Sequence, residues 1–124
     1  MNDVHGRYVM VVDDDDEIRE ALADVLTDEG YEVVGARDGM QALEYLRKGR
    51  RPNAILLDLW MPVMDGWQLR HELLSDSKLS DIPVIVLTAV RDQRAQGLMV
   101  ADILTKPVQL ERLLGALAAT TRGS

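Results

Sequence analysis

The stretch YVMVVDDDDEIREALADVLTDEG, residues 8–30, decides the fold of this chain. Residues 8–12 are apolar or β-branched without polar alternation, which is typical of a strand covered on both faces and therefore of a parallel sheet. After five acidic residues, apolar side chains recur along one helical face, and Gly30 stands where a helix should end. That face is formed by Ile18, Ala21, Leu22, Val25 and Leu26. The stretch predicts a buried strand, an acidic turn and an amphipathic helix.

Similar strand patterns recur along the chain. Residues 32–36, 54–57 and 84–87 are short apolar or β-branched runs, and the run at 102–105 is shorter and more polar. The first three suit strands inside a layered sheet, whereas the last suits an edge strand.

Helical patterns lie between and after these strands. One helix is predicted to open at Asp38 and Gly39 and to end near Gly49, and Asp65 can cap another. Their apolar faces carry Ala42, Leu43 and Leu46, and Leu69, Leu73 and Leu74, while a last helix carries Leu110, Leu113, Leu114 and Leu117. Between residues 88 and 102 the pattern is weak and predicts only a short, poorly anchored helix. Strand and helix thus alternate five times, which predicts a doubly wound α/β sandwich with right-handed crossovers.

The composition bounds the class of protein. A chain of 124 residues is expected to form one domain, residues 1–124, with its core at about 7–119. The net charge of -7 argues against direct binding to nucleic acid, which needs a basic surface. The absence of cysteine excludes disulfides, zinc-thiolate sites and thiol nucleophiles. No apolar run approaches the roughly 18 residues that cross a membrane, and the N-terminus does not resemble a signal peptide, so we expect a cytoplasmic protein.

Acidic side chains gather at the predicted strand ends. Asp13 and Asp14 follow the first strand, and Asp58 follows the third. The carboxyl ends of parallel strands meet at one edge of the sheet, so these three carboxylates should lie together. At ~5 Å and an effective dielectric constant of ~20, each pair would repel by about 3 kcal/mol. The remaining acids, residues 15–17, are expected to be solvated, with Asp15 or Asp16 capping the helix.

A hard divalent cation would relieve this repulsion. Mg²⁺ prefers one or two carboxylates, a carbonyl, waters and phosphate oxygens as its ligands. Thr88 and Lys106 follow the fourth and fifth strands and should reach the same edge. Three carboxylates, Mg²⁺ and Lys106 sum to zero formal charge, so a phosphoryl group would meet no net repulsion there.

Four motifs together resemble the response-regulator receiver domain of two-component signalling. They are VVDD at residues 11–14, ILLDLWMPVMDG at 55–66, VIVLTA at 84–89 and LTKP at 104–107. The resemblance covers about residues 7–119. It implies a flavodoxin-like fold with five parallel strands in the order 2-1-3-4-5.

The same resemblance implies roles for individual residues. Asp58 would be the phosphoacceptor, and Mg²⁺ would be held by Asp13, Asp14, Asp58 and the backbone carbonyl of Trp60. A carboxylate nucleophile that forms an aspartyl phosphate is an established covalent route.

Two further residues complete the implied site. Thr88 would donate its hydroxyl to one phosphoryl oxygen, and Lys106 would pair with another. The bond between Lys106 and Pro107 resembles a cis bond of the family. The implied partners are a sensor histidine kinase or a phosphotransfer protein, with homodimers as one mode of assembly. Such a domain acts on itself and is not an enzyme with an external substrate.

Three features depart from the family pattern. The stretch from Thr88 to Lys106 is short by about four residues, close to one helical turn. Ile103 stands where relatives usually carry Tyr or Phe, so a switch based on rotation of an aromatic ring is in doubt. Trp60 and Val90 flank the expected approach of hydrolytic water and cannot act as bases, which predicts slow hydrolysis of a phosphorylated Asp58.

Two other functions remain open from the sequence. A phosphorylation-independent interaction domain of the same fold would explain Ile103 and the shortened stretch, but not the complete set of acids. A magnesium-dependent phosphohydrolase of the haloacid-dehalogenase type is suggested by Asp13 and Asp15, which form an Asp-x-Asp pattern. That family usually has Thr or Val at the position of Glu17. It also has an acidic pair late in the chain that binds the metal, and no such pair follows Lys106 in this sequence.

Overall fold

The chain folds as alternating strands and helices in a computed structural model, which describes residues 7–89, 95 and 97–121. The elements are β1 (Tyr8–Val12), α1 (Asp16–Asp28), β2 (Glu32–Ala36), α2 (Gly39–Lys48), β3 (Ala54–Asp58), α3 (Gly66–Leu74), β4 (Val84–Thr88), β5 (Asp102–Thr105) and α4 (Leu110–Thr121). Within the described ranges, no helix combines the length and apolar composition needed to cross a membrane.

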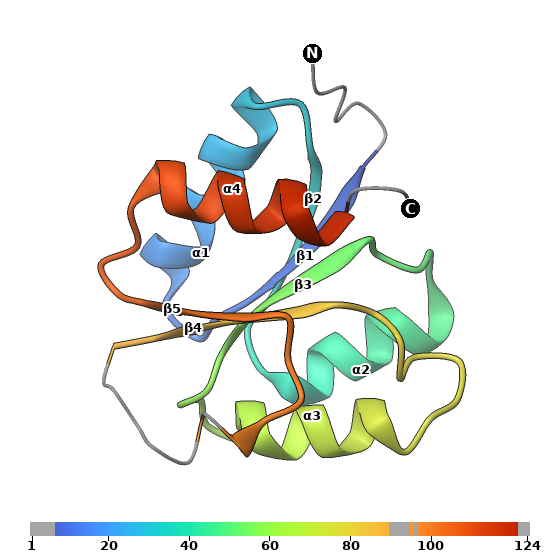
Figure 1. Cartoon of the computed structure of the whole chain (residues 1–124). Coiled ribbons are helices and arrows are strands. Elements are labelled where there is room, and N and C mark those ends of the chain that lie inside the picture. Colours follow the sequence, from blue (N-terminus) through green and yellow to red (C-terminus); the bar gives the residue numbers. More distant parts are fainter. Residues whose placement is uncertain (1–6, 90–94, 96, 122–124) are drawn as a thin grey trace.

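The five strands form one parallel sheet in the order β2-β1-β3-β4-β5. Helices α1 and α4 cover one face of the sheet, and α2 and α3 cover the other (Figure 1). This confirms the flavodoxin-like sandwich, with β5 at an edge as its polar sequence predicts. Because every strand runs the same way, the ends of β1, β3, β4 and β5 lie along one side of the molecule.

Each face of the sheet has its own apolar core, because successive strand side chains point to opposite faces. In β1, Met10 and Val12 join the core under α2 and α3, whereas Val9 and Val11 join the core under α1 and α4. The central strands β3 and β4 are buried along their whole length. This packing holds the strand ends, and hence the site, on a rigid support.

Helix starts are set by the predicted caps. The Asp15 carboxylate accepts hydrogen bonds from the backbone N–H groups of Glu17 and Ile18 and so caps α1. Asp65 caps α3 through a reciprocal capping box with Gln68. At the other end of α1, Gly30 has a φ of 100°, a conformation that glycine adopts without strain.

Some details differ from the sequence-based expectations. Asp58 and Thr88 are the last residues of β3 and β4 and do not follow those strands. Leu74 and Leu110 are exposed because they sit at helix ends, and Ala21 is exposed on the flank of α1. The short helix expected between residues 88 and 102 falls largely on residues 90–94 and 96, which lie outside the described residues; residues 95 and 97–101 contain no α-helix.

Candidate phosphoacceptor site

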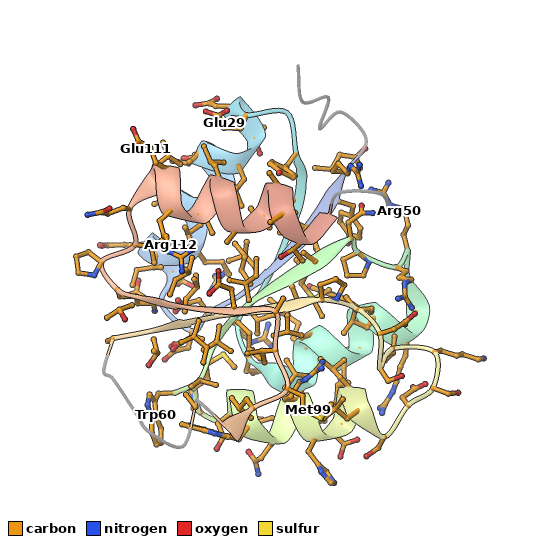
Figure 2. All side chains as sticks on the ribbon, viewed as in Figure 1. Glu29, Arg50, Trp60, Met99, Glu111 and Arg112 are labelled. Atoms are coloured by element: carbon orange, nitrogen blue, oxygen red, sulfur yellow. The ribbon has the colours of Figure 1, made fainter. Side chains whose placement is uncertain are left out.

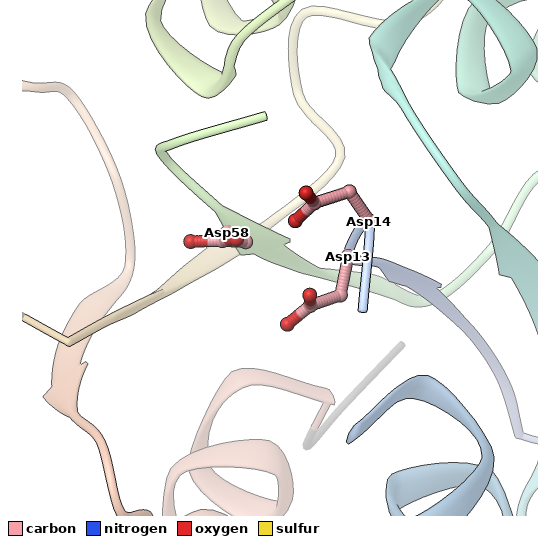
Figure 3. A group of neighbouring side chains, drawn as sticks. All are labelled: Asp13, Asp14 and Asp58. Carbon is pink, nitrogen blue, oxygen red and sulfur yellow. The ribbon is translucent and has the colours of Figure 1, made fainter. Parts of the chain in front are cut away.

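Three carboxylates lie together at the carboxyl ends of β1 and β3. Each of Asp13, Asp14 and Asp58 offers an oxygen atom, and these atoms all lie within 4.8 Å of one another. Figure 3 shows Asp13 and Asp14 extending from the turn after β1 and Asp58 from the end of β3, on the same side of the strand ends. The structure therefore brings together the three acids that the sequence placed at one edge.

Asp13 is almost completely buried, at 1% exposure, and both of its carboxylate oxygens have partners. Oδ1 accepts a hydrogen bond of 2.9 Å from the backbone N–H of Asp15, and Oδ2 lies 2.8 Å from Lys106 Nζ. Its own N–H donates to the carbonyl of Ala36. Asp13 is thus fixed between two strands and a lysine 93 residues away in the chain.

Asp58 is less well compensated. Its side chain is buried, and Lys106 Nζ lies 3.8 Å from Oδ2, against 2.8 Å from Asp13. Burial raises the pKa of Asp58 to about 6; Lys106 and the Trp60 N–H lower it, whereas Asp13 and Asp14 raise it. The single lysine does not neutralise three acids, so the site favours an additional cation.

The donor set fits a hard divalent cation. The candidate ligand atoms of Asp13, Asp14 and Asp58 are all carboxylate oxygens, which suit Mg²⁺ better than soft metals. The Trp60 N–H donates to Asp58 Oδ1 at 3.3 Å, which places the backbone of Trp60 beside the acids. The assignment of its carbonyl as a ligand stays a prediction.

Helix α3 supports Asp58 from behind. The Gly66 N–H donates to the Leu59 carbonyl at 2.9 Å. A Cβ atom on Gly66 would lie 2.7 Å from the Asp58 carbonyl oxygen and from Leu59 Cα. Only glycine permits this close approach, so the first residue of α3 fixes the backbone at the end of β3.

Thr88 and Lys106 complete the group of predicted site residues. Thr88 is buried at the end of β4, and its carbonyl accepts a hydrogen bond of 2.8 Å from the Lys106 N–H. The bond between Lys106 and Pro107 is cis, as the resemblance implied. Trp60 is 48% exposed, and its indole ring packs edge-on against Trp67, with ring centroids 4.7 Å apart (Trp60 is labelled in Figure 2).

One residue near the site was missed from the sequence. Arg19, in α1, donates from Nη1 to the Asp13 carbonyl at 2.8 Å. A signal was present: positive charge near the start of a helix opposes the helix dipole, so a cation at this position indicates another role.

Comparison with known proteins agrees with this geometry. The family model described as "Response regulator receiver domain" matches residues 9–118. The chain belongs to the response regulator receiver domain family. It is thus a receiver domain of a two-component response regulator, a signalling module.

Curated relatives of this receiver domain are response regulators. MprA of Mycobacterium ulcerans (strain Agy99) is 42% identical and MprA of Mycobacterium sp. (strain KMS) is 41% identical, each over 119 residues. These matches cover 92% of this chain and 50% of the relatives, so the chain spans about half their length.

Solved receiver domains share the fold. The signal receiver domain of a histidine kinase from Syntrophus aciditrophicus has a TM-score of 0.88 at 30% identity, covering 95% of this chain and 92% of the other. The chemotaxis protein CheY4 of Vibrio cholerae has a TM-score of 0.84 at 31% identity, covering 92% and 98%.

Proposed function

We propose that Asp58 accepts a phosphoryl group and that Asp13, Asp14, Thr88 and Lys106 serve that transfer. The observation that carries the proposal is the convergence of three carboxylates, with oxygens within 4.8 Å of one another, beside a lysine ammonium. The mutual repulsion of these acids is a cost that partner binding alone does not explain, whereas phosphoryl transfer uses a bound metal ion and a positioned nucleophile, which such acids can supply.

Asp13, Asp14 and Asp58, with the Trp60 carbonyl, would hold Mg²⁺. When bound, the ion supplies positive charge that offsets the acids and the phosphoryl oxygens. The family generally binds this ion, and the oxygen-only cluster supports the same assignment here.

The transfer itself forms one bond to phosphorus and breaks another. An Asp58 carboxylate oxygen attacks phosphorus, a new O–P bond forms, and the bond from phosphorus to the donor breaks with its electron pair leaving on the donor. The donor is histidine when it is a protein, and acetate leaves when the donor is acetyl phosphate. Lys106 and Thr88 would each bind one phosphoryl oxygen, which fixes the group in line for attack.

The two alternatives are less well supported. Asp15 uses its carboxylate to cap α1 through the N–H groups of Glu17 and Ile18, and it is not a member of the acid cluster. The Asp-x-Asp pattern is therefore better explained by a helix cap than by a phosphohydrolase site. A phosphorylation-independent module would not need Asp58 buried with a raised pKa.

The biological setting is part of the proposal. A receiver domain implies a histidine kinase or a phosphotransfer protein as the phosphoryl donor. We extend this to a self-modifying domain, with its core at residues 7–119, that works in the cytoplasm, with a homodimer as one mode of assembly. Its net charge of -7 disfavours direct contact with nucleic acid.

The experiment is incubation with acetyl phosphate and Mg²⁺ followed by intact mass measurement. We expect one added phosphoryl group on the wild type and on Asp81→Asn, a matched change at an exposed acid outside the cluster, and none on Asp58→Asn. Continuous release of phosphate through Asp13 would indicate a phosphohydrolase. If the wild type gains no mass, the proposal fails and the phosphorylation-independent interaction domain becomes the better-supported function.

A further inference from the structure

Arg19 ties helix α1 to the backbone of the acid cluster. Its Nη1 donates to the Asp13 carbonyl oxygen at 2.8 Å, and its Nη2 pairs with the Asp16 carboxylate. Asp13 is the residue directly after β1, and the last register pair of β1 and β2 is Val12 with Ala36. The Asp13 carbonyl therefore lies beyond this ladder, and the Arg19 guanidinium satisfies it.

The path of the Arg19 side chain depends on Gly35 in β2. A Cβ atom at Gly35 would lie 3.0 Å from Arg19 Cδ and 3.2 Å from Cγ. Even the smallest side chain at residue 35 would therefore push the arginine stem by a few tenths of an ångström. The absence of a side chain on Gly35 leaves the space in which Arg19 reaches Asp13.

We infer that Arg19 is a positioning residue for the cation site, an inference that rests on the proposed function. The peptide group that Arg19 holds joins Asp13 to Asp14, two of the three acids of the cluster. By fixing the plane of this peptide, Arg19 fixes the direction in which both carboxylates leave the backbone. Partners of this kind, one shell beyond the ligands, typically change metal affinity by about ten- to a hundredfold.

The charge of Arg19 and its positioning role predict opposite changes in Mg²⁺ affinity when Arg19 is removed. As a nearby positive charge, Arg19 repels Mg²⁺, so charge alone predicts tighter binding when it is removed. As a positioning group, it pre-orients the acids, so its removal weakens binding. The sign of the change therefore separates the two roles.

The test is isothermal titration of Mg²⁺ into wild type, Arg19→Met and Arg19→Lys. We expect about tenfold weaker binding in both variants, because lysine keeps the charge but cannot donate to Asp13 and Asp16 together. At saturating Mg²⁺, labelling by acetyl phosphate should return toward the wild-type rate, since the bound ion then orders the acids itself.

Arg51→Met is a matched control. Arg51 makes the same two kinds of contact, donating to the Lys78 carbonyl at 2.6 Å and pairing with Asp81 at 2.5 Å. Its partners Lys78 and Asp81 precede β4 and so lie toward the amino ends of the strands, whereas the acid cluster lies at their carboxyl ends. Arg51→Met should lower thermal stability to a similar degree as Arg19→Met and leave Mg²⁺ affinity unchanged.

Gly35→Ala supplies an independent test that leaves every polar group in place. It should weaken Mg²⁺ binding in the wild-type background and have no further effect in Arg19→Met, because it acts through the arginine stem. Equal effects of Gly35→Ala in both backgrounds would overturn the inference. Unchanged or tighter Mg²⁺ binding in Arg19→Met would overturn it too, whereas failure of the wild type to bind Mg²⁺ would overturn the proposed function itself.

Discussion

At the scale of single residues, Asp58 is held where its ionised form is disfavoured. Burial is the main cause, and the neighbouring acids add to it, so the pKa of Asp58 rises from 3.8 to about 6. A raised pKa means that the folded state binds the proton more tightly than the unfolded chain does. The stabilisation from this proton is complete below pH 3.8 and is lost as the pH rises through about 6.

Asp58→Asn should therefore stabilise the metal-free domain at neutral pH. Asparagine has the same shape and carries no charge to bury. A pKa raised from 3.8 to about 6 corresponds to at most about 3 kcal/mol, so we expect a gain on the order of 2 kcal/mol at pH 7. The gain should shrink to nothing near pH 4 in urea denaturation measured with chelator present.

Asp81→Asn is a control, because the pKa of Asp81 is shifted in the opposite direction to that of Asp58. A hydrogen bond from Arg51 lowers the pKa of Asp81, so its contribution is present above the unfolded pKa and is lost as the pH falls. Asp81→Asn should therefore not stabilise the domain at pH 7. A gain for Asp58→Asn that is independent of pH would show that burial of its charge is not the cause.

At the scale of elements, the loop from β3 to α3 stores backbone strain beside the site. Val63 has a φ of 70°, and the Met64 N–H donates to the Pro62 carbonyl at 2.8 Å across it. This is a tight γ-turn with positive φ, a conformation that is rare and strained for a β-branched residue. The Val63 side chain is 75% exposed, so packing within the domain offsets little of this strain.

Val63→Gly should raise the stability of the domain. Glycine adopts positive φ without steric cost, and relief of strain exceeds its extra unfolded-state entropy, so we expect a gain on the order of 1 kcal/mol. Urea denaturation measures it. Val63→Ile retains the branched side chain and serves as the control. Equal stability of the glycine variant and the wild type would show that the turn is not strained.

At the scale of the whole molecule, the sheet brings residues that lie far apart in the sequence together in one acid cluster, the proposed phosphorylation site. It also decides how long a phosphorylated state would last. Trp60 follows Asp58 by two residues, and its ring, packed against Trp67, offers no group that could activate water. Val90, the second residue expected to flank the water, lies outside the described residues.

The phosphorylated domain should therefore be long-lived. We expect label on Asp58 to decay slowly in purified protein with Mg²⁺, because the side chain of Trp60, two residues after Asp58, cannot act as a general base for an attacking water. Intact mass followed over time after removal of acetyl phosphate measures the decay. Loss of the label within seconds would contradict the prediction, and Trp60→Gln should shorten the lifetime if the ring restricts water.

Ile103, in the edge strand β5, occupies the position at which the resemblance to receiver domains predicts an aromatic ring. Ile103 is partly buried against the core under α2 and α3, with Leu98 and Val100 packed against the same core. An aliphatic side chain in this position contributes packing but has no ring to rotate. Signalling by this domain is therefore better sought in the backbone after Thr88 than in the residue at position 103.

Much of the architecture was determined by local sequence patterns. The five strands, the four described helices and the caps at Asp15, Asp38 and Asp65 follow from periodicity and cap chemistry, which act within a few residues. The motifs at strand ends also placed the acids correctly, because parallel strands must bring their carboxyl ends to one edge.

Other features were decided only by tertiary packing. The contact of Lys106 with Asp13 spans 93 residues, and its closer approach to Asp13 than to Asp58 depends on how two strands and two loops pack. The reach of Arg19 to the Asp13 carbonyl depends on an empty space at Gly35 in another strand. Local patterns carry no information on such distances, because each is set by side chains that meet only after the sheet and its helices have assembled.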